Sequence, residues 1–266
     1  MRELFFFLFK PSHFNTGIAV TAFSVAHIVY MLLIFGVLIG LYFLLRRKTD
    51  EQKKKAMGIL VNLIIFSYVS DFFVHEFVNG TIENPGGLNI DKLPFHLCTC
   101  LGVLAPFVQY NKKFEKIKEP VVLTAIFSSL AYLVYPAAIT DSEPWCYEAF
   151  QTMFFHGTLL TWGTLNLLLG VVKLNIKNCW KEAVFIVCFT LWAKLGNLLF
   201  EHNWYFLAED VFYIGLVGNG IIPQWSLMII NPVMTFAAVL GIYGIYYLVS
   251  HIKEERQKYK AKMVHA

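Results

Sequence analysis

Two side chains able to do chemistry lie close together where a polar loop turns into an apolar run. They are His96 and Cys98, in the segment 93–100. Because proline is favoured at the first position of a helix, Pro94 predicts a helix that begins here and leaves Cys98 within about a turn of its positive end. That position favours the thiolate, the nucleophilic form of cysteine. The alternative interpretation is structural, with Cys98 a small buried hydrophobe and His96 an interfacial helix-cap residue.

A cysteine nucleophile needs a general base, and histidine is the side chain used most often. His156 is the better candidate on position, because it falls on another predicted helix at a depth comparable to that of Cys98. His96, two residues from Cys98, points to roughly the opposite side of a regular helix and suits orientation or capping. The third member, which would orient the base, is predicted to be Asp71, His75 or Glu201.

Further polar residues of the predicted helices are candidates for binding a substrate. Asp71 and His75 are four residues apart and therefore share a helical face. Ionisable groups in a membrane are costly unless they are paired or face a hydrated cavity, so a cluster of them at one end of the helices predicts a functional site. The predicted substrate-binding residues are Lys194, Asn197, Gln151 and His27.

Two other kinds of site draw on the same residues. A zinc site has enough potential ligands, but there is no HExxH motif and the histidines are dispersed one per helix, so no metal is predicted. Its ligands would come from His75, Glu76, His96, Cys98, His156, Glu201 and His202. In a transporter, Asp71, Lys194 and Glu201 would form a buried ion-coupling network, although the chain shows no internal repeat of the kind many transporters have.

The composition is that of an integral membrane protein. Of the 266 residues 57% are hydrophobic and only 15% are charged, and several runs exceed the roughly 18 to 20 apolar residues that cross a bilayer as a helix. The predicted fold class is all-α: a single transmembrane domain over 1–266, with an interfacial segment at 1–17, a seven-helix bundle at 18–250 and a basic cytoplasmic tail at 251–266. The predicted helices are Ile18–Leu45, Ala56–Val78, Phe95–Tyr110, Pro120–Pro136, Ala149–Val172, Ala183–Phe200 and Trp225–Ser250.

The charges of the loops predict the orientation of the bundle. Lysine and arginine gather in every second loop, at 46–55, 112–118 and 173–181, and in the tail, whereas the loops between them carry mostly acidic residues. The positive-inside rule therefore places the N-terminus outside and the C-terminus in the cytoplasm. With that orientation the ionisable residues of the helices gather at the outer end. The formal net charge of +4 indicates contact with anionic lipid, and no module that binds nucleic acid is present.

The motif around Cys98 also carries a resemblance. The residues LPFHLC at 93–98, followed about two helices later by Gln151 and by Phe155-His156-Gly157, resemble the YwaF-like family of bacterial membrane proteins. Further matches are the pattern from Phe23 to His27 and the residues 203–207. The related eukaryotic family, the transmembrane protein 164 family, implies a phospholipid acyltransferase that uses a cysteine and a histidine, and Cys98 and His156 match that pair. The androgen-induced protein group of membrane hydrolases is similar in architecture but uses threonine in place of the cysteine.

These observations predict a membrane-embedded acyltransferase or transacylase that moves a fatty-acyl group between lipids through a Cys98 thioester, with His156 as base. Two alternatives stay open: a lipid ester hydrolase with the same dyad, and a non-enzymatic transporter with a polar cavity in its outer half. An outward site is beyond the reach of cytoplasmic acyl-CoA, so membrane phospholipids are the expected substrates and partners. No cofactor is expected. The predicted location is the bacterial plasma membrane, with multiple spans, and the oligomeric state is unknown.

Overall fold

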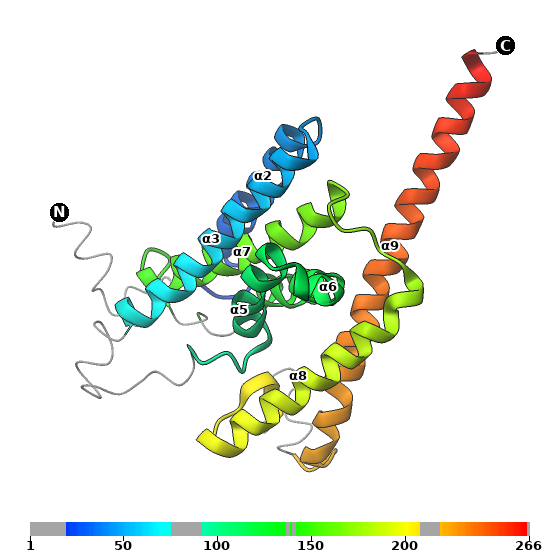
Figure 1. Cartoon of the computed structure of the whole chain (residues 1–266). Coiled ribbons are helices and arrows are strands. Elements are labelled where there is room, and N and C mark those ends of the chain that lie inside the picture. Colours follow the sequence, from blue (N-terminus) through cyan, green and yellow to red (C-terminus); the bar gives the residue numbers. More distant parts are fainter. Residues whose placement is uncertain (1–19, 76–91, 137–138, 140–141, 208–218, 265–266) are drawn as a thin grey trace.

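The computed structural model describes residues 20–75, 92–136, 139, 142–207 and 219–264 (Figure 1), with backbone alone at 73–75, 253–254 and 256–264. Throughout these residues the regular structure is helical, with seven α-helices and no strand. This confirms the predicted all-α class. The helices are α2 (Val25–Leu45), α3 (Asp50–His75), α5 (Leu97–Tyr110), α6 (Glu115–Val134), α7 (Tyr147–Leu168), α8 (Cys179–Phe200) and α9 (Leu227–Val264).

The helix boundaries differ from the predicted ones where capping decides them. Helix α5 begins at Leu97, because Pro94 lies in a turn and the extended His96 occupies the N-cap position. Helix α2 begins at Val25, where the Ser24 hydroxyl accepts a hydrogen bond from the His27 N–H over 3.3 Å. Helix α9 continues through the predicted tail as far as Val264. The predicted interfacial segment 1–17 lies outside the described residues.

Five of the helices are long and apolar enough to cross a membrane, namely α2, α3, α6, α8 and α9. Helix α5 is apolar but shorter, with 14 residues. Large apolar side chains point outward from the outer helices, among them Leu33 on α2 and Leu198 on α8, both more than half exposed. In water such surfaces would be costly, whereas lipid accommodates them. The chain is therefore a multi-pass membrane protein, and the count of seven spans stays a prediction.

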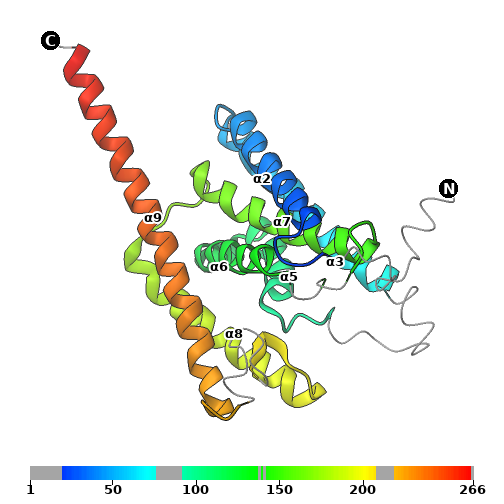
Figure 2. The ribbon, with the colours of Figure 1, turned by 180° about the vertical axis from the view of Figure 1, so that it is seen from behind.

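Helix α7 is the centre of the bundle. Most of its residues are buried, because α6, α3 and α2 pack around it, and α5 lies against α3 and α6. Helices α8 and α9 pack together and reach the rest of the bundle through α6. Figures 1 and 2 show these two helices on one side of the central group and α2 on the opposite side. Helices α3, α5, α6 and α7 therefore enclose the part of the bundle in which polar side chains can be buried together.

The basic segments share one end of this bundle. The Gln109 amide, at the end of α5, donates to the Lys54 carbonyl over 3.3 Å. The Asn175 N–H, in the basic segment before α8, donates to Glu119 near the start of α6 over 3.0 Å. The loop that contains Lys92 lies at the other end, with the close of α3 and the start of α7. The described contacts thus place the basic segments at one end of the bundle. Most of the acidic loop residues lie outside the described residues, so the predicted orientation in the membrane stays a prediction.

An aromatic cluster fixes the start of α5 against α8. The Phe95 ring stacks on Trp192 and packs against Trp204, with 4.7 Å between ring centroids in each pair. The Trp192 indole N–H donates to the Pro94 carbonyl over 2.8 Å. Gly196 on α8 gives the ring its space, because a Cβ there would lie 2.5 Å from Phe95 Cδ1. The residues before Cys98 are therefore held by packing on both sides.

We expect Gly196→Ala to destabilise the protein by about 1 to 3 kcal/mol, because the added methyl overlaps a ring that its neighbours hold in place. Thermal unfolding in detergent checks this. Gly241→Ala is the matched control, since a Cβ at this helical glycine meets nothing within 4 Å. If both variants unfolded at the wild-type temperature, the packing described for Phe95 would be wrong.

Candidate functional site

Cys98 is the second residue of α5 and lies in its first turn. The first backbone N–H groups of a helix have no acceptor within the helix, so the start of α5 carries a partial positive charge close to Cys98. The Thr99 hydroxyl, one residue later, donates to the His96 carbonyl over 2.9 Å. The side chain of Ser128 on α6 lies near the Cys98 thiol, while its hydroxyl donates to the Ala125 carbonyl over 3.4 Å. The prediction that Cys98 lies within a turn of a helix N-terminus is confirmed, although Pro94 does not begin that helix.

His156 lies on α7 with 8% of its surface exposed. Its Nδ1 is 2.8 Å from the Thr152 carbonyl oxygen, one turn earlier on the same helix. A carbonyl can only accept, so Nδ1 carries the proton and Nε2 has the lone pair that a general base needs. The ring stacks on Tyr132 of α6, with 3.7 Å between centroids and 10° between planes. Backbone and stacking together fix the tautomer and the plane of the imidazole.

One face of α6 brings the two groups together. Ser128, which lies near the Cys98 thiol, and Tyr132, which stacks on His156, are four residues apart and therefore lie one above the other on that helix. Helices α5 and α7 also touch directly, since a Cβ at Gly102 would lie 2.8 Å from the ring of Phe155. Cys98 and His156 thus lie beside neighbouring turns of one face of α6.

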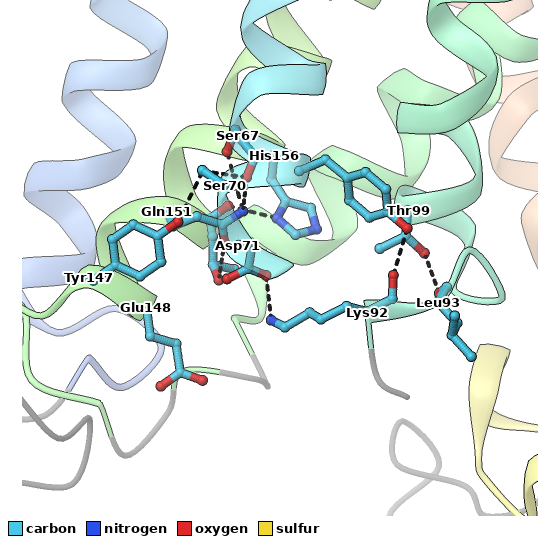
Figure 3. Close-up of polar contacts among 12 residues, drawn as sticks. Ser67, Ser70, Asp71, Lys92, Leu93, Thr99, Tyr147, Glu148, Gln151 and His156 are labelled. Carbon is cyan, nitrogen blue, oxygen red and sulfur yellow. Dashed lines mark hydrogen bonds and ion pairs between the residues drawn. The ribbon is translucent and has the colours of Figure 1, made fainter. Parts of the chain in front are cut away.

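A polar network lies around His156 (Figure 3). The Asp71 carboxylate, 5% exposed, forms an ion pair with Lys92 Nζ at 2.7 Å. The Gln151 amide donates to the carbonyl of Ser67 over 3.1 Å. Lys92 and His96 lie within electrostatic range of the His156 ring. Gln151 and Asp71 therefore belong to the surroundings of the dyad.

The group that orients the His156 ring is not one of the three side chains predicted for that role. The Thr152 carbonyl, and not a carboxylate, contacts His156 Nδ1. Asp71 is engaged with Lys92 instead. His75 is the last residue of α3, and its side chain lies outside the described part of the chain. Glu201 is exposed at the end of α8, in a left-handed backbone conformation.

The remaining predicted binding residues form no hydrogen bond with Cys98 or His156 in the described part of the chain, and two of them are bonded to other groups. The His27 ring accepts from the Phe23 N–H at Nδ1 over 2.9 Å and faces the Leu133 carbonyl with Nε2 at 2.7 Å, so both nitrogens already have partners. The Asn197 amide pairs with both backbone groups of Trp204, at 2.7 and 3.1 Å. Lys194 is half-buried on α8. Roles for these residues in substrate binding stay predictions.

Ser128, Tyr132 and Lys92 complete the arrangement, and sequence reasoning did not select them. Lys92 could have been found as a rare cation in a loop that otherwise carries acids, directly before the motif. Ser128 and Tyr132 have the spacing of one helical face, but nothing in the sequence says which helix that face meets. For metal binding, no group of three or more His, Cys, Asp or Glu side chains lies close together in the described part of the chain.

The fold, with its long apolar helices, defines a multi-pass helical membrane protein. The chain belongs to the TMEM164 family, whose model matches residues 22–249. The match includes helices α2 to α8, α9 as far as residue 249, and both members of the pair. It confirms the predicted relation to the transmembrane protein 164 family. No curated protein and no solved structure matches the chain.

Proposed function

We propose that this protein is a membrane-embedded acyltransferase that carries a fatty-acyl group on Cys98 and uses His156 as general base. The observation that carries the proposal is the shared face of α6, on which Tyr132 stacks on the imidazole of His156 and Ser128, one turn earlier, lies near the Cys98 thiol. A cysteine in the first turn of a helix and a histidine with Nε2 unprotonated are the two groups that thioester chemistry requires. Membership of the TMEM164 family is consistent with this chemistry.

The reaction follows from these groups in two half-reactions. His156 Nε2 takes the Cys98 proton, the thiolate attacks the ester carbonyl, and the C–O bond breaks as the leaving alcohol takes the proton from His156. The acyl group then rests on sulfur. In the second half-reaction His156 removes the proton of an acceptor hydroxyl, which attacks the thioester, and the leaving thiolate recovers the proton. The Nδ1–H bond to the Thr152 carbonyl supports the imidazolium that forms each time.

The tetrahedral intermediates carry negative charge on the former carbonyl oxygen. Backbone N–H groups in the first turn of α5 have no helical acceptor and lie beside Cys98, so they are suited to bind that oxygen. The positive end of the helix dipole adds to the same effect. Rotation of the thiol from Ser128 toward His156 would begin the reaction.

The expected substrates follow from the predicted orientation. A site at the outer end of the bundle meets phospholipid rather than cytoplasmic acyl-CoA, so a phospholipid is the proposed donor and a second lipid hydroxyl the acceptor. With water as acceptor the same groups would make a lipid ester hydrolase. We place the protein in the bacterial plasma membrane as part of this proposal.

A lipid-exchange assay tests the function. Purified protein in detergent is given a phospholipid with an isotope-labelled acyl chain and an unlabelled lysophospholipid, and the products are followed by mass spectrometry. Labelled acyl chain on the former lysophospholipid supports the transferase, whereas labelled free fatty acid supports the hydrolase. If neither product forms, and vesicles take up a solute equally well with wild type and Cys98→Ala, the protein is a transporter and the proposal fails.

Tyr132 provides a graded test of the same geometry. We expect Tyr132→Leu to lower turnover about three- to ten-fold, because an aromatic contact of this kind contributes about 0.5 to 1.5 kcal/mol and here it orients the base. Tyr132→Phe is the matched control and should keep most of the activity, since it retains the stacked ring. Equal loss in both variants would assign the effect to the hydroxyl and not to the stack.

A further inference from the structure

A second buried polar cluster lies at the opposite end of the bundle from Cys98. It consists of Glu119 on α6, Glu182 in the first turn of α8 and Tyr243 on α9, all of them buried. Both glutamates lie just outside the helices predicted from the sequence, one residue before Pro120 and one before Ala183. The proposed acyl transfer does not use them, so their burial needs a separate explanation.

The hydrogen bonds of Glu119 are those of an ionised carboxylate. Its Oε1 accepts from the Asn175 N–H over 3.0 Å and from the Tyr243 hydroxyl over 2.8 Å. Its Oε2 accepts from the Asn178 amide over 2.8 Å. Three donors on two oxygens stabilise a negative charge in a buried place. Glu119 therefore has enough hydrogen-bond donors to be stable as a buried anion.

Glu182 has fewer hydrogen-bond donors around its carboxyl group than Glu119 has. It is 0% exposed, its Oε2 has no hydrogen-bond partner among the described residues, and its Oε1 lies 3.4 Å from the Tyr243 oxygen. A tyrosine hydroxyl has one hydrogen, and the shorter contact to Glu119 uses it. An ionised Glu182 would then face the lone pairs of Tyr243 with an uncompensated buried charge, which is costly. A neutral Glu182 avoids this cost.

We propose that Glu182 is a proton-binding site of the folded protein. Its Oε1–H donates to the Tyr243 oxygen, and the Tyr243 hydroxyl donates to the Glu119 carboxylate. This directed chain of hydrogen bonds joins α8, α9 and α6. When the proton leaves for water, two negative carboxylates share one phenol, and the contacts between the three helices weaken. The bound proton therefore stabilises the packing of α8 and α9 against α6.

The charges around Glu182 come from each helix that packs on it. Glu119 from α6 opposes ionisation of Glu182, and the neighbouring Lys181 on α8 favours it. Tyr243 from α9 is the neutral link between the carboxyls. Asn175 and Asn178, from the segment before α8, bond to Glu119 alone. The donors that would compensate a second charge are thus already directed at the first.

The proposal predicts how stability changes with pH. An unfolded glutamate releases its proton near pH 4.3, roughly. Folded Glu182 keeps its proton, so above about pH 5 unfolding releases one proton and stability falls as the pH rises toward the point where folded Glu182 ionises. Over that interval this one proton raises the unfolding equilibrium constant by up to about tenfold per pH unit.

The experiment compares thermal unfolding of the full chain in detergent between about pH 6 and about pH 9, together with the infrared band of protonated carboxyl groups. Glu182→Gln, a neutral isostere, should fold at least as stably as wild type near pH 9, lose the added pH slope and lack the band. Glu119→Gln should be less stable at every pH. The exposed Glu255→Gln is the control and should match wild type.

Three results would overturn the proposal. One is a Glu182→Gln chain that does not fold, because glutamine reproduces the neutral form. Another is a carboxyl band and pH slope that persist in Glu182→Gln. The third is stability that depends on Na⁺ or K⁺ concentration at fixed pH and ionic strength in wild type but not in Glu182→Gln, which would make a metal cation the occupant.

Discussion

Replacement of Cys98 by alanine is expected to abolish acyl transfer, with a loss of at least about 1,000-fold in turnover. The reason is chemical, because alanine leaves no atom on which the acyl group can rest. The change is small in volume, and the neighbouring Phe95 cluster still holds the start of α5. The lipid-exchange assay measures the loss, and thermal unfolding shows that the variant is folded.

Cys100→Ala is the matched control for this variant. Cys100 is on the same helix, two residues away, and is also partly buried among apolar side chains. It contributes to packing, so its replacement should lower stability slightly and leave turnover within about twofold of wild type. If Cys100→Ala lost activity as severely as Cys98→Ala, the effect would be one of packing and Cys98 would not be the nucleophile.

Replacement of His156 by alanine is expected to lower turnover by about 100- to 10,000-fold, the range typical of a general base. The thiol remains, and raising the pH should recover part of the rate, since hydroxide can then form the thiolate without a base. Wild type should gain much less over the same interval. The assay is the same lipid exchange, measured for both proteins across a range of pH.

His251→Ala is the control for this second variant, because His251 is exposed on α9, far along the chain from the pair. It should retain full turnover. An His156→Ala protein that is folded and has wild-type turnover would remove the base from the account. An inactive variant with no response to pH would instead assign His156 to structure alone.

The helices could be predicted because each one carries its own signal. Apolar length and basic loops identify every helix of the described bundle to within a few residues at most ends. The start of α5 was less accurate, since Pro94 is favoured both in turns and at the first helical position, and only the contacts of Phe95 with Trp192 decide between them. Helix ends depend on tertiary contacts that a local pattern does not contain.

Cys98 and His156 could be selected from residue type and depth, but what positions them could not. Ser128 and Tyr132 are ordinary residues of an apolar helix until α5 and α7 pack against the same face of it. The orienting group of His156 is a backbone carbonyl, which every residue has and no sequence pattern marks. Only the packing of the helices shows which groups position Cys98 and His156.

Glu182 illustrates the same limit at the other end of the bundle. In the sequence it lies in a basic segment directly before the predicted helix Ala183–Phe200, and nothing in that local pattern shows that it is buried. The structure buries it behind Tyr243, because α9 crosses the starts of α6 and α8 there. Glu182 is thus a residue of the protein interior, although its neighbours in the sequence are charged.

Intact mass spectrometry of the purified protein after incubation with phospholipid is the most direct test of the central claim. Wild type should gain the mass of one fatty-acyl group, hydroxylamine should remove it, and Cys98→Ala should never acquire it, whereas Cys100→Ala should label like wild type. No adduct on wild type under conditions where lipid exchange proceeds, or an adduct that Cys98→Ala still forms, would contradict acyl transfer through Cys98.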